Sequence, residues 1–288
     1  MTELTGIDSR IKLNNGTSIP CVGYGTFRTP ADVSRKAVAD AIKVGYRHID
    51  TASRYGNEEA IGQGIKDSGI DRKDLFVTSK LWNDMRGYDN ARQSFLESLE
   101  RLQLDYLDLY LVHWPATVKQ FGEKAKKLNA ETWRALEDLY HEGKVKAIGV
   151  SNFLPHHIEE LMETAETIPA IDQIEIHPGF PHTEEVQWLQ NHGIVVEGWA
   201  PLGGQGSKVM SNHTINEIAN KYSKSAAQVT LRWILQRGII PLPKSVHENR
   251  MIQNKDIFDF NLTPEEMNKI SSLTNLGGFC VNPDNVDF

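Results

Sequence analysis

The sequence predicts an α/β fold, a single (β/α)8 TIM barrel with an N-terminal β-hairpin cap, from three observations. Eight short apolar runs alternate with amphipathic helical patterns along the 288 residues, which is typical of a parallel sheet covered by helices. No composition break or Pro/Gly-rich linker divides the chain, so we expect one domain over residues 1–288. No complete G-x-G-x-x-G motif follows a strand-like run, which disfavours the alternative, an open doubly wound sheet that binds a dinucleotide.

The hairpin cap is predicted from residues 10–23. Two short strand-like pieces flank Asn15-Gly16, a dipeptide that favours the positive φ angles of a tight hairpin turn. We expect this hairpin to close one end of the barrel.

The barrel strands are predicted from the short apolar runs. They cover residues 22–25, 48–50, 75–80, 107–113, 147–150, 171–176, 194–199 and 239–242. Helices are predicted where apolar residues recur three and four positions apart. They cover residues 33–44, 58–66, 90–102, 130–142, 154–165 and 229–235. A further helix is expected to open with Thr183 as its N-cap, and Ser225 with Gln228 has the spacing of a capping box before residue 229.

Composition narrows the classes of partner. The chain carries 31 basic and 38 acidic side chains, a formal net charge of −7, which is unlike the basic footprint of a nucleic-acid binder. No apolar run approaches the length of about eighteen residues needed for a membrane span, and the first residues lack the pattern of a signal peptide. Cys21 and Cys280 form no spaced motif, so we expect two buried thiols. We therefore expect a cytoplasmic protein without nucleic-acid or membrane partners.

Four polar residues mark the candidate active site. Asp50, Lys80 and His113 each end an apolar run, and Tyr55 follows Asp50 in the next loop. The C-terminal ends of parallel barrel strands meet on one face, where (β/α)8 enzymes place their chemistry. An acid, a phenol, an amine and an imidazole on one face suggest proton transfer.

Tyr55 is the candidate proton donor. A free phenol has a pKa of about 10, and an ammonium about 4 Å away interacts with it by roughly 4 kcal/mol at an effective dielectric near 20. We therefore expect Lys80 to lower the pKa of Tyr55 by up to about three units, with Asp50 keeping the lysine protonated. His113 would then orient a carbonyl oxygen, or act as the acid itself for some substrates.

Two further groups of residues point to ligand binding. Lys244, Ser245 and Arg250 follow the last strand and offer two cations and a hydroxyl to a phosphate group. Aromatic residues gather at strand ends and suggest an apolar pocket, in which Trp199 could stack on a flat ring. They are Phe27, Trp82, Trp114 and Trp199.

Four segments together resemble the signatures of the aldo-keto reductase superfamily. They are GYRHIDTASRYGNEE at 45–59, TSKLW at 78–82, LVHWP at 111–115 and PKSVHENR at 243–250. The resemblance runs in order over about residues 10–275. It implies a (β/α)8 barrel without a metal, NADPH-dependent reduction of aldehydes and ketones by hydride transfer from the nicotinamide, and a monomer.

The resemblance also implies roles for single residues. Tyr55 would donate the proton, Asp50 and Lys80 would adjust the pKa of Tyr55, and His113 would position the carbonyl. Phe27, Trp82 and Trp114 would line the substrate pocket. The residues that match cofactor-binding positions are Gly25, Thr26, Asp50, Ser151, Asn152, Gln173, Trp199, Pro201, Leu202, Gly203, Lys244, Ser245, Val246, Arg250, Gln253 and Asn254.

Within the cofactor set, different positions match different parts of NADPH. Residues 151, 152 and 173 match those that hold the carboxamide, and Trp199 matches the ring that stacks on the nicotinamide. Residues 201–203 match the loop over the pyrophosphate. Lys244, Ser245 and Arg250 match the 2′-phosphate site, and Asn254 the adenine end.

The chain departs from the family pattern at two positions and in its tail. Trp199 stands where many members have tyrosine. A tryptophan at this position is similar to the pattern of bacterial members that act on small dicarbonyls and keto sugars. We therefore expect a small polar carbonyl or dicarbonyl substrate. Gln253 stands where glutamate is common. The tail after Thr274 is short, so we expect the pocket to be open on one side.

Two alternatives remain open from the residues alone. A metal-dependent barrel hydrolase could use His48, Asp50, His113 and His177 as ligands, although this leaves Tyr55 and the basic cluster without a role. The other alternative is a non-catalytic protein that binds NADPH as a regulator.

Overall fold

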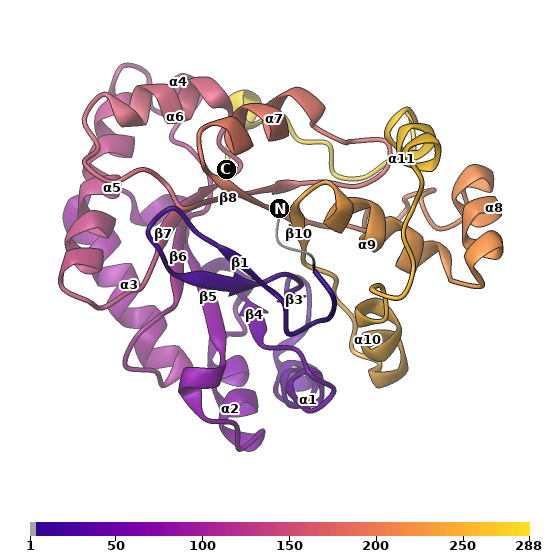
Figure 1. The fold of residues 1–288 in the computed structure, drawn as a ribbon. Coiled ribbons are helices and arrows are strands. Elements are labelled where there is room, and N and C mark those ends of the chain that lie inside the picture. The colour runs from indigo at the N-terminus through magenta and orange to yellow at the C-terminus, as the bar shows by residue number, and fades with distance from the viewer. Residues whose placement is uncertain (1–3) are drawn as a thin grey trace.

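The barrel is closed by backbone hydrogen bonds between its first and last strands. The computed structural model describes residues 4–288 and shows eight parallel strands, β3 to β10, in chain order around one sheet (Figure 1). Gly23 N donates to Pro241 O and Gly25 N to Pro243 O, each at 3.1 Å. The predicted (β/α)8 architecture is confirmed, while the single-domain organisation stays a prediction. Residues 1–3, part of the segment for which no signal peptide was expected, lie outside the described residues.

All eight predicted strands are present, and no end is shifted by more than two residues. They are β3 (Tyr24–Gly25), β4 (His48–Asp50), β5 (Phe76–Leu81), β6 (Leu109–Val112), β7 (Ile148–Ser151), β8 (Ile171–Glu175), β9 (Val195–Trp199) and β10 (Ile239–Pro241). Parallel strands buried on both faces need near-continuous apolar runs, which is why these segments could be identified from sequence.

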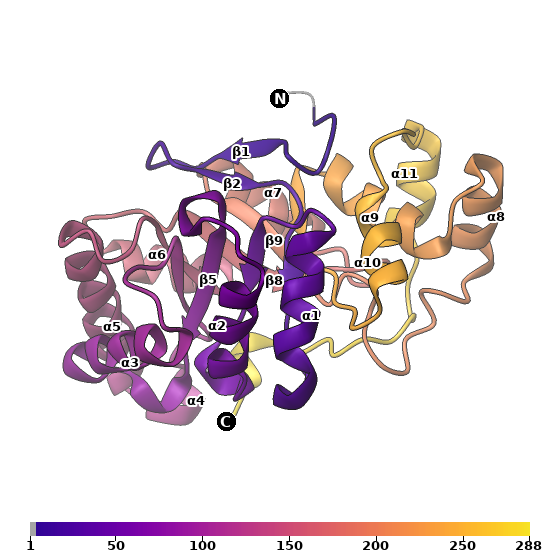
Figure 2. The same cartoon turned by 90° about the horizontal axis from the view of Figure 1, so that it is seen from below.

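Helices surround the barrel, as Figures 1 and 2 show. Those that match predicted helices are α1 (Ala31–Lys43), α2 (Glu58–Asp67), α3 (Tyr88–Leu102), α5 (Lys124–His141), α6 (Pro155–Met162), α7 (Thr183–Asn191) and α9 (Ala226–Gln236). Those that were not predicted are α4 (Val118–Phe121), α8 (His213–Tyr222), α10 (Glu248–Lys255) and α11 (Pro264–Ser271). Helix α10 buries only Met251 and Asn254, too few residues to give a helical period. No helix within residues 4–288 is long and apolar enough to cross a membrane.

One of the two predicted N-caps is wrong. Helix α7 begins at Thr183 itself, so His182 holds the N-cap position, and no side chain caps the helix. The capping box of α9 is confirmed: Gln228 N donates to Ser225 Oγ at 3.3 Å, and Ser225 N donates to Gln228 Oε1 at 3.0 Å.

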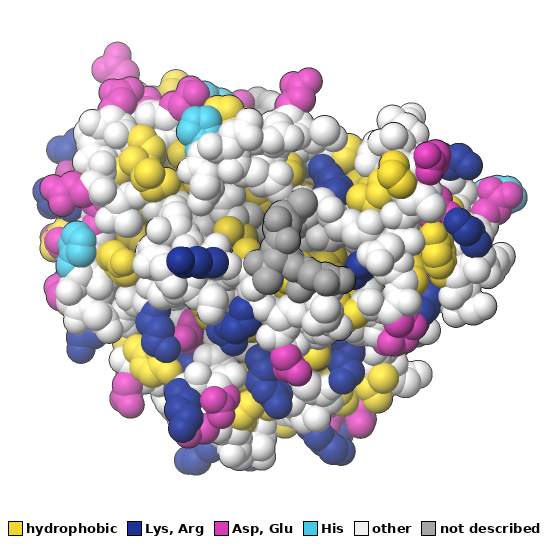
Figure 3. Space-filling view, viewed as in Figure 1, with side chains coloured by type: hydrophobic (Ala, Val, Ile, Leu, Met, Phe, Trp, Pro, Cys, Tyr) yellow, Lys and Arg dark blue, Asp and Glu magenta, His cyan; other side chains and the backbone are white. Residues whose placement is uncertain are grey.

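The hairpin closes the N-terminal end of the barrel, as expected. Strands β1 (Arg10–Lys12) and β2 (Ser18–Pro20) are antiparallel, and Leu13 and Ile19 pack in the cluster that fills the barrel bottom. The turn is longer than predicted, because Leu13 N bonds to Thr17 O and only Gly16 has a positive φ, at 87°. Figure 2 shows the hairpin at one end and the C-terminus at the other. Figure 3 shows acidic and basic side chains interspersed on the hairpin face.

The barrel interior changes from apolar to polar toward the C-terminal ends of the strands. Inward-facing residues alternate along each strand: in β5, Phe76 belongs to the bottom cluster, and Lys80 lies two inward positions further along. Likewise Ile171 of β8 lies below Gln173. The alternation therefore places a buried polar layer directly beneath the barrel mouth, where it can support a site.

The expectation of two buried thiols is half correct. Both cysteines are free, and Cys21 is buried. Cys280 is exposed, because it lies in the tail after the last helix rather than in the core.

Candidate active site

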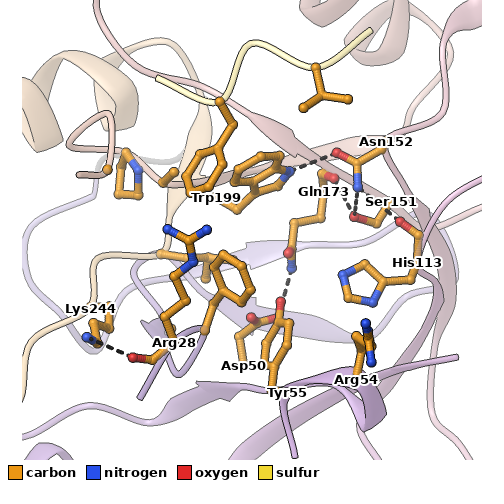
Figure 4. Close-up of a pocket in the computed structure, with 18 of the residues that line it drawn as sticks. Arg28, Asp50, Arg54, Tyr55, His113, Ser151, Asn152, Gln173, Trp199 and Lys244 are labelled. Carbon is orange, nitrogen blue, oxygen red and sulfur yellow. Dashed lines mark hydrogen bonds between the residues drawn. The ribbon is translucent and has the colours of Figure 1, made fainter. Parts of the chain in front are cut away.

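A cavity of about 810 Å³ opens at the C-terminal ends of the strands, a size typical of ligand sites. Figure 4 shows Asp50 and Tyr55 at its centre, with His113 on one side and Lys244 on the other. Asp50 ends β4, and Tyr55 ends the short 3₁₀ helix η1 (Ser53–Tyr55) that follows it. The cavity therefore lies on the face of the barrel where the active site was predicted, at the C-terminal ends of the strands.

Asp50, Lys80 and Tyr55 form one hydrogen-bonded group. The fully buried Lys80 Nζ donates to Asp50 Oδ1 at 2.7 Å and Oδ2 at 2.8 Å, to Thr51 O at 3.0 Å and to Tyr55 Oη at 3.1 Å. Burial lowers the pKa of Lys80, but Asp50 and Tyr55 outweigh it and raise the pKa above its ordinary value. The lysine is therefore an ammonium at neutral pH and points a donor at the phenol oxygen.

The pKa of Tyr55 shifts in the direction opposite to the one we expected from sequence. Desolvation in the cavity raises it, Lys80 lowers it, Asp50 raises it again, and the result lies above the ordinary value. The expected shift included the effect of the Lys80 ammonium but not that of burial, which is the larger of the two. The phenol therefore stays protonated at neutral pH, and it can still protonate a forming alkoxide, because an alkoxide is far more basic than a phenolate.

His113 stands beside the phenol as a neutral imidazole. Its ring centroid lies 5.7 Å from that of Tyr55 and 5.1 Å from that of Trp82. Burial, and then the charge of Lys80, lower the pKa of His113 well below its ordinary value. A neutral ring can hydrogen-bond a carbonyl oxygen but is a poor proton donor at neutral pH, so the phenol is the better-placed acid.

Gln173 and Glu197 extend this group into the barrel, a feature that the sequence analysis missed. Gln173 Nε2 donates to Asp50 Oδ1 at 2.8 Å and to Glu197 Oε2 at 2.9 Å. Glu197 Oε1 lies 3.6 Å from Nε2 of the buried His48. Burial, then Asp50, raise the pKa of Glu197 to about 8. The inward position of Glu197 in β9 was the signal that could have revealed it.

Because the pKa of Glu197 is raised, the protein should lose stability as pH rises. Between about pH 4.5 and 8 the folded chain keeps a proton on Glu197 that the unfolded chain releases, so alkali favours unfolding. Relative to a Glu197→Gln variant, the wild-type free energy of unfolding should fall by up to a few kcal/mol over this range, at 1.36 kcal/mol per pKa unit. Urea denaturation of both proteins at pH 5 and pH 8 measures this difference. A pH-independent difference would show that Glu197 titrates normally.

The four side chains expected around the nicotinamide, three at its carboxamide and Trp199 on its ring, lie together on one wall of the cavity (Figure 4). Ser151 Oγ donates to Gln173 O at 2.7 Å, and Asn152 Nδ2 donates to Ser151 Oγ and to His113 O, both at 3.0 Å. Trp199 Nε1 donates to Asn152 Oδ1 at 2.9 Å. Gln173 Oε1 accepts no hydrogen bond from the described residues. This wall is thus fixed in place and has one amide oxygen available to a ligand.

Of the residues predicted in the first strand and in the loop after β9, only some line the cavity. Gly25, Pro201 and Leu202 line it. Thr26 is buried, and its Oγ1 donates to Asp50 O at 2.9 Å, so it supports Asp50 from behind. Gly203 does not line the cavity; with φ at 79° it forms the turn that presents the neighbouring residues 204 and 205.

The predicted phosphate cluster is spread over the rim and beyond it. Lys244 lines the cavity, and its Nζ donates to Arg28 O at 3.4 Å. Ser245 Oγ accepts from His247 N at 3.1 Å in a local turn. In the segment from residue 244 to residue 254, the predicted cofactor-binding residues outside the cavity lining are Ser245, Val246, Arg250, Gln253 and Asn254. The structure therefore brings only Lys244 of this set directly to the cavity.

The three predicted substrate-pocket residues line the cavity, and the C-terminal tail joins them. Trp82 stacks on Phe288 with ring centroids 5.6 Å apart, and Phe279 lies 6.1 Å from Phe27 and 5.4 Å from Trp199. The tail-derived lining residues are Phe279, Val281 and Phe288. Although it is short, the tail thus contributes part of the pocket wall.

Glu175 anchors this tail. Its Oε1 accepts from Phe279 N at 2.7 Å, and its Oε2 accepts from Cys280 N at 2.8 Å. Glu175 ends β8 and is buried. A long-range contact of this kind leaves no pattern in the sequence, which is why the tail was not assigned to the pocket.

The ligand set of the alternative metal hydrolase does not assemble. Asp50 is bound to Lys80, and His48 lies beneath it in the barrel, 3.1 Å from Thr78 Oγ1. Among the described residues, the clusters close enough to share one ion are Glu175, His177 and Cys280, and His156, His157 and Asp284. Of the four predicted ligands, only His177 belongs to either cluster.

Comparisons with known proteins agree with this geometry. The model of the aldo/keto reductase family matches residues 21–275. Glyoxal reductase of Bacillus subtilis is 46% identical over 99% of both chains. An aldo-keto reductase from a Medee basin deep-sea metagenome library is 43% identical, with a TM-score of 0.90 over 96% of this chain and 100% of that one. An aldo-keto reductase of Bombyx mori, solved in complex with NADP, is 40% identical, with a TM-score of 0.85 over 91% of this chain and 92% of that one. This chain belongs to the aldo/keto reductase family.

Proposed function

We propose that the protein reduces small aldehydes and ketones to alcohols with NADPH as the reductant. The observation that carries this proposal is the buried Asp50–Lys80–Tyr55 group, which holds a protonated phenol at the cavity beside the neutral His113. The phenol would protonate the carbonyl oxygen as it becomes an alkoxide, and His113 would hydrogen-bond that oxygen. NADPH, when bound, supplies the hydride.

The residues of the cavity fit the cofactor at three points. The available Oε1 of Gln173 suits the amide N–H of a carboxamide, and Trp199, fixed through Asn152, offers a ring for stacking. Lys244 at the rim supplies a cation for a phosphate group. That the similar protein of Bombyx mori was solved in complex with NADP supports the same choice of cofactor.

The substrate is proposed to be a small polar carbonyl or dicarbonyl compound. The cavity of about 810 Å³ must hold both nicotinamide and substrate, and Phe27, Trp82 and Trp114 narrow its substrate side. Similarity to a glyoxal reductase supports this size class. A monomer and a cytoplasmic location stay predictions.

The test is to titrate the purified protein with NADPH and NADH, following tryptophan fluorescence, and then to measure NADPH oxidation with glyoxal and methylglyoxal. Quenching by NADPH and turnover of either dicarbonyl would support the proposal. Binding without turnover of any carbonyl compound would favour the alternative of a non-catalytic regulator. No response to either cofactor would refute both.

Removing the Lys244 ammonium should separate the two cofactors. In Lys244→Met, binding of NADPH should weaken by about 1.5–3 kcal/mol, the usual contribution of a hydrogen bond to a charged group, while binding of NADH should hardly change. Fluorescence titration gives both dissociation constants. Equal losses for NADPH and NADH would count against the assignment of Lys244 to the 2′-phosphate.

A further inference from the structure

The cavity has an excess of positive charge that the proposed reaction does not explain. Its charged lining residues are Arg28, Asp50, Arg54 and Lys244. The single carboxylate side chain of this lining, that of Asp50, is already paired with Lys80 at 2.7 Å. Three cations therefore face a cavity in a protein whose net charge is −7, which indicates a ligand with negative charge.

Two of these cations lie on one side of the catalytic group, and Arg54 lies on the other. Figure 4 shows Arg28 and Lys244 together, whereas Arg54 stands next to His113. Lys244 Nζ donates to Arg28 O at 3.4 Å, which joins this pair at the proposed phosphate end of the cofactor. Arg54 is thus placed with the groups that would contact the substrate.

Arg54 has no anionic partner within the described part of the chain. No carboxylate of residues 4–288 lies within ion-pair distance of its guanidinium, and the side chain is exposed to the cavity. The guanidinium carbon lies 5.1 Å from the centre of the Trp82 ring, an arrangement in which the cation is held by the ring face. Its N–H groups therefore remain available to a ligand.

The position of Arg54 is fixed relative to the proton donor. It is the middle residue of η1 (Ser53–Tyr55), and Ser53 Oγ anchors this turn by donating to Lys80 O at 2.9 Å. A substrate whose carbonyl oxygen meets Tyr55 and His113 would therefore present its neighbouring substituent to Arg54.

We propose that Arg54 selects substrates that carry a carboxylate near the carbonyl group, namely oxo acids and acid semialdehydes. This rests on the proposed reductase function and names the preferred class within it. A guanidinium binds a planar carboxylate through two parallel N–H bonds. The other residues on this side, Trp82, Trp114 and Phe288, have uncharged aromatic side chains, so Arg54 would be the one side-chain cation for the two charges of a phosphate dianion.

Paired substrates that differ in charge test the proposal. 4-Formylbenzoate and its methyl ester share the ring and the aldehyde. Succinic semialdehyde and butanal share the four-carbon chain and the aldehyde. The wild-type kcat/KM should be higher for the acid of each pair. In Arg54→Gln the acid-to-neutral ratio should fall about 10- to 100-fold, the range expected for a lost hydrogen bond to a charged group, mainly through the KM of the acid.

Matched variants separate charge from geometry. Arg54→Lys keeps the charge but loses the planar fork, so it should retain only part of the preference. Lys66→Gln removes an exposed cation of α2 outside the cavity lining and should leave the ratio unchanged. An equal fall of the ratio in Lys66→Gln would overturn the proposal, since the effect would then be one of net charge.

Three other results would overturn it as well. The ratio could stay unchanged in Arg54→Gln. The variant could weaken NADPH binding as much as Lys244→Met does, which would place Arg54 at the cofactor. Arg54→Gln could also lower the kcat/KM ratio of glyceraldehyde 3-phosphate to glyceraldehyde more than it lowers the acid-to-neutral ratio. Arg54 would then select a phosphate group and not a carboxylate. If the wild-type protein reduced none of these compounds with NADPH, the proposed function itself would fail.

Discussion

Replacement of Tyr55 by phenylalanine is expected to lower kcat by roughly 10²–10⁴, the usual contribution of a positioned acid. The variant keeps the ring but loses the hydroxyl that accepts from Lys80 Nζ at 3.1 Å. The wall formed by Ser151, Asn152 and Trp199 does not depend on this hydroxyl, so the affinity for NADPH should be nearly unchanged. Initial rates with methylglyoxal and a fluorescence titration with NADPH measure both quantities.

The matched control is Tyr140→Phe, which removes a hydroxyl from α5 outside the cavity lining. Its kcat should equal that of the wild type. Because the pKa of Tyr55 is raised, ionisation of this phenol should not reduce the wild-type rate at neutral or mildly alkaline pH. A near-normal rate for Tyr55→Phe would refute the role of the phenol as proton donor.

The positions of the strand-end residues could be predicted because they follow from a simple geometric rule. Parallel strands need apolar runs, and the residues that end these runs meet on one face. Asp50, Lys80 and His113 were placed correctly on this basis alone. The loop residue Tyr55 was found because it follows Asp50 within one short turn, so its distance from the strand end is limited by chain length.

The parts that could not be predicted depend on burial and on contacts far apart in the sequence. The raised pKa of Tyr55 results from desolvation in the cavity, which the sequence does not reveal. Gln173 reaches Asp50 across 123 positions, and the C-terminal tail reaches the cavity through Glu175. Neither contact has a local signal such as a turn residue or an apolar period.

For a related reason, the sequence could not show which residues of the predicted phosphate cluster line the cavity. The spacing of Lys244, Ser245 and Arg250 brings them close along the chain, but β10 ends at Pro241 and α10 starts only at Glu248. The intervening turn directs Lys244 to the cavity and uses the Ser245 hydroxyl internally. Proximity in sequence did not fix the direction of each side chain. Arg54, in contrast, was next to the predicted acid and could have been proposed from its position alone.

Replacement of Lys80 by methionine is expected to destabilise the protein as well as to inactivate it. Lys80 and Asp50 are buried together, with side-chain exposures of 0% and 5%. Removing one partner leaves a buried charge without its counterion, which typically costs about 3–5 kcal/mol. Gln173 Nε2 would remain as a donor to Asp50 and cannot replace the positive charge. Guanidinium denaturation gives the free energy of unfolding, and comparison of m values shows whether the unfolding transition stays the same.

The double variant Asp50→Asn/Lys80→Met distinguishes loss of the charge pair from loss of packing. With both charges removed, the desolvation penalty disappears, so stability should return close to the wild-type value. Turnover should not return, because Tyr55 would still lack the ammonium that donates to its oxygen. The surface pair Lys36–Asp40, in which the lysine side chain is 80% exposed, supplies the control, since Lys36→Met should change stability little. A double variant as unstable as Lys80→Met would show that the lysine side chain contributes through its packing, and recovered activity would show that the phenol donates its proton without help from Lys80.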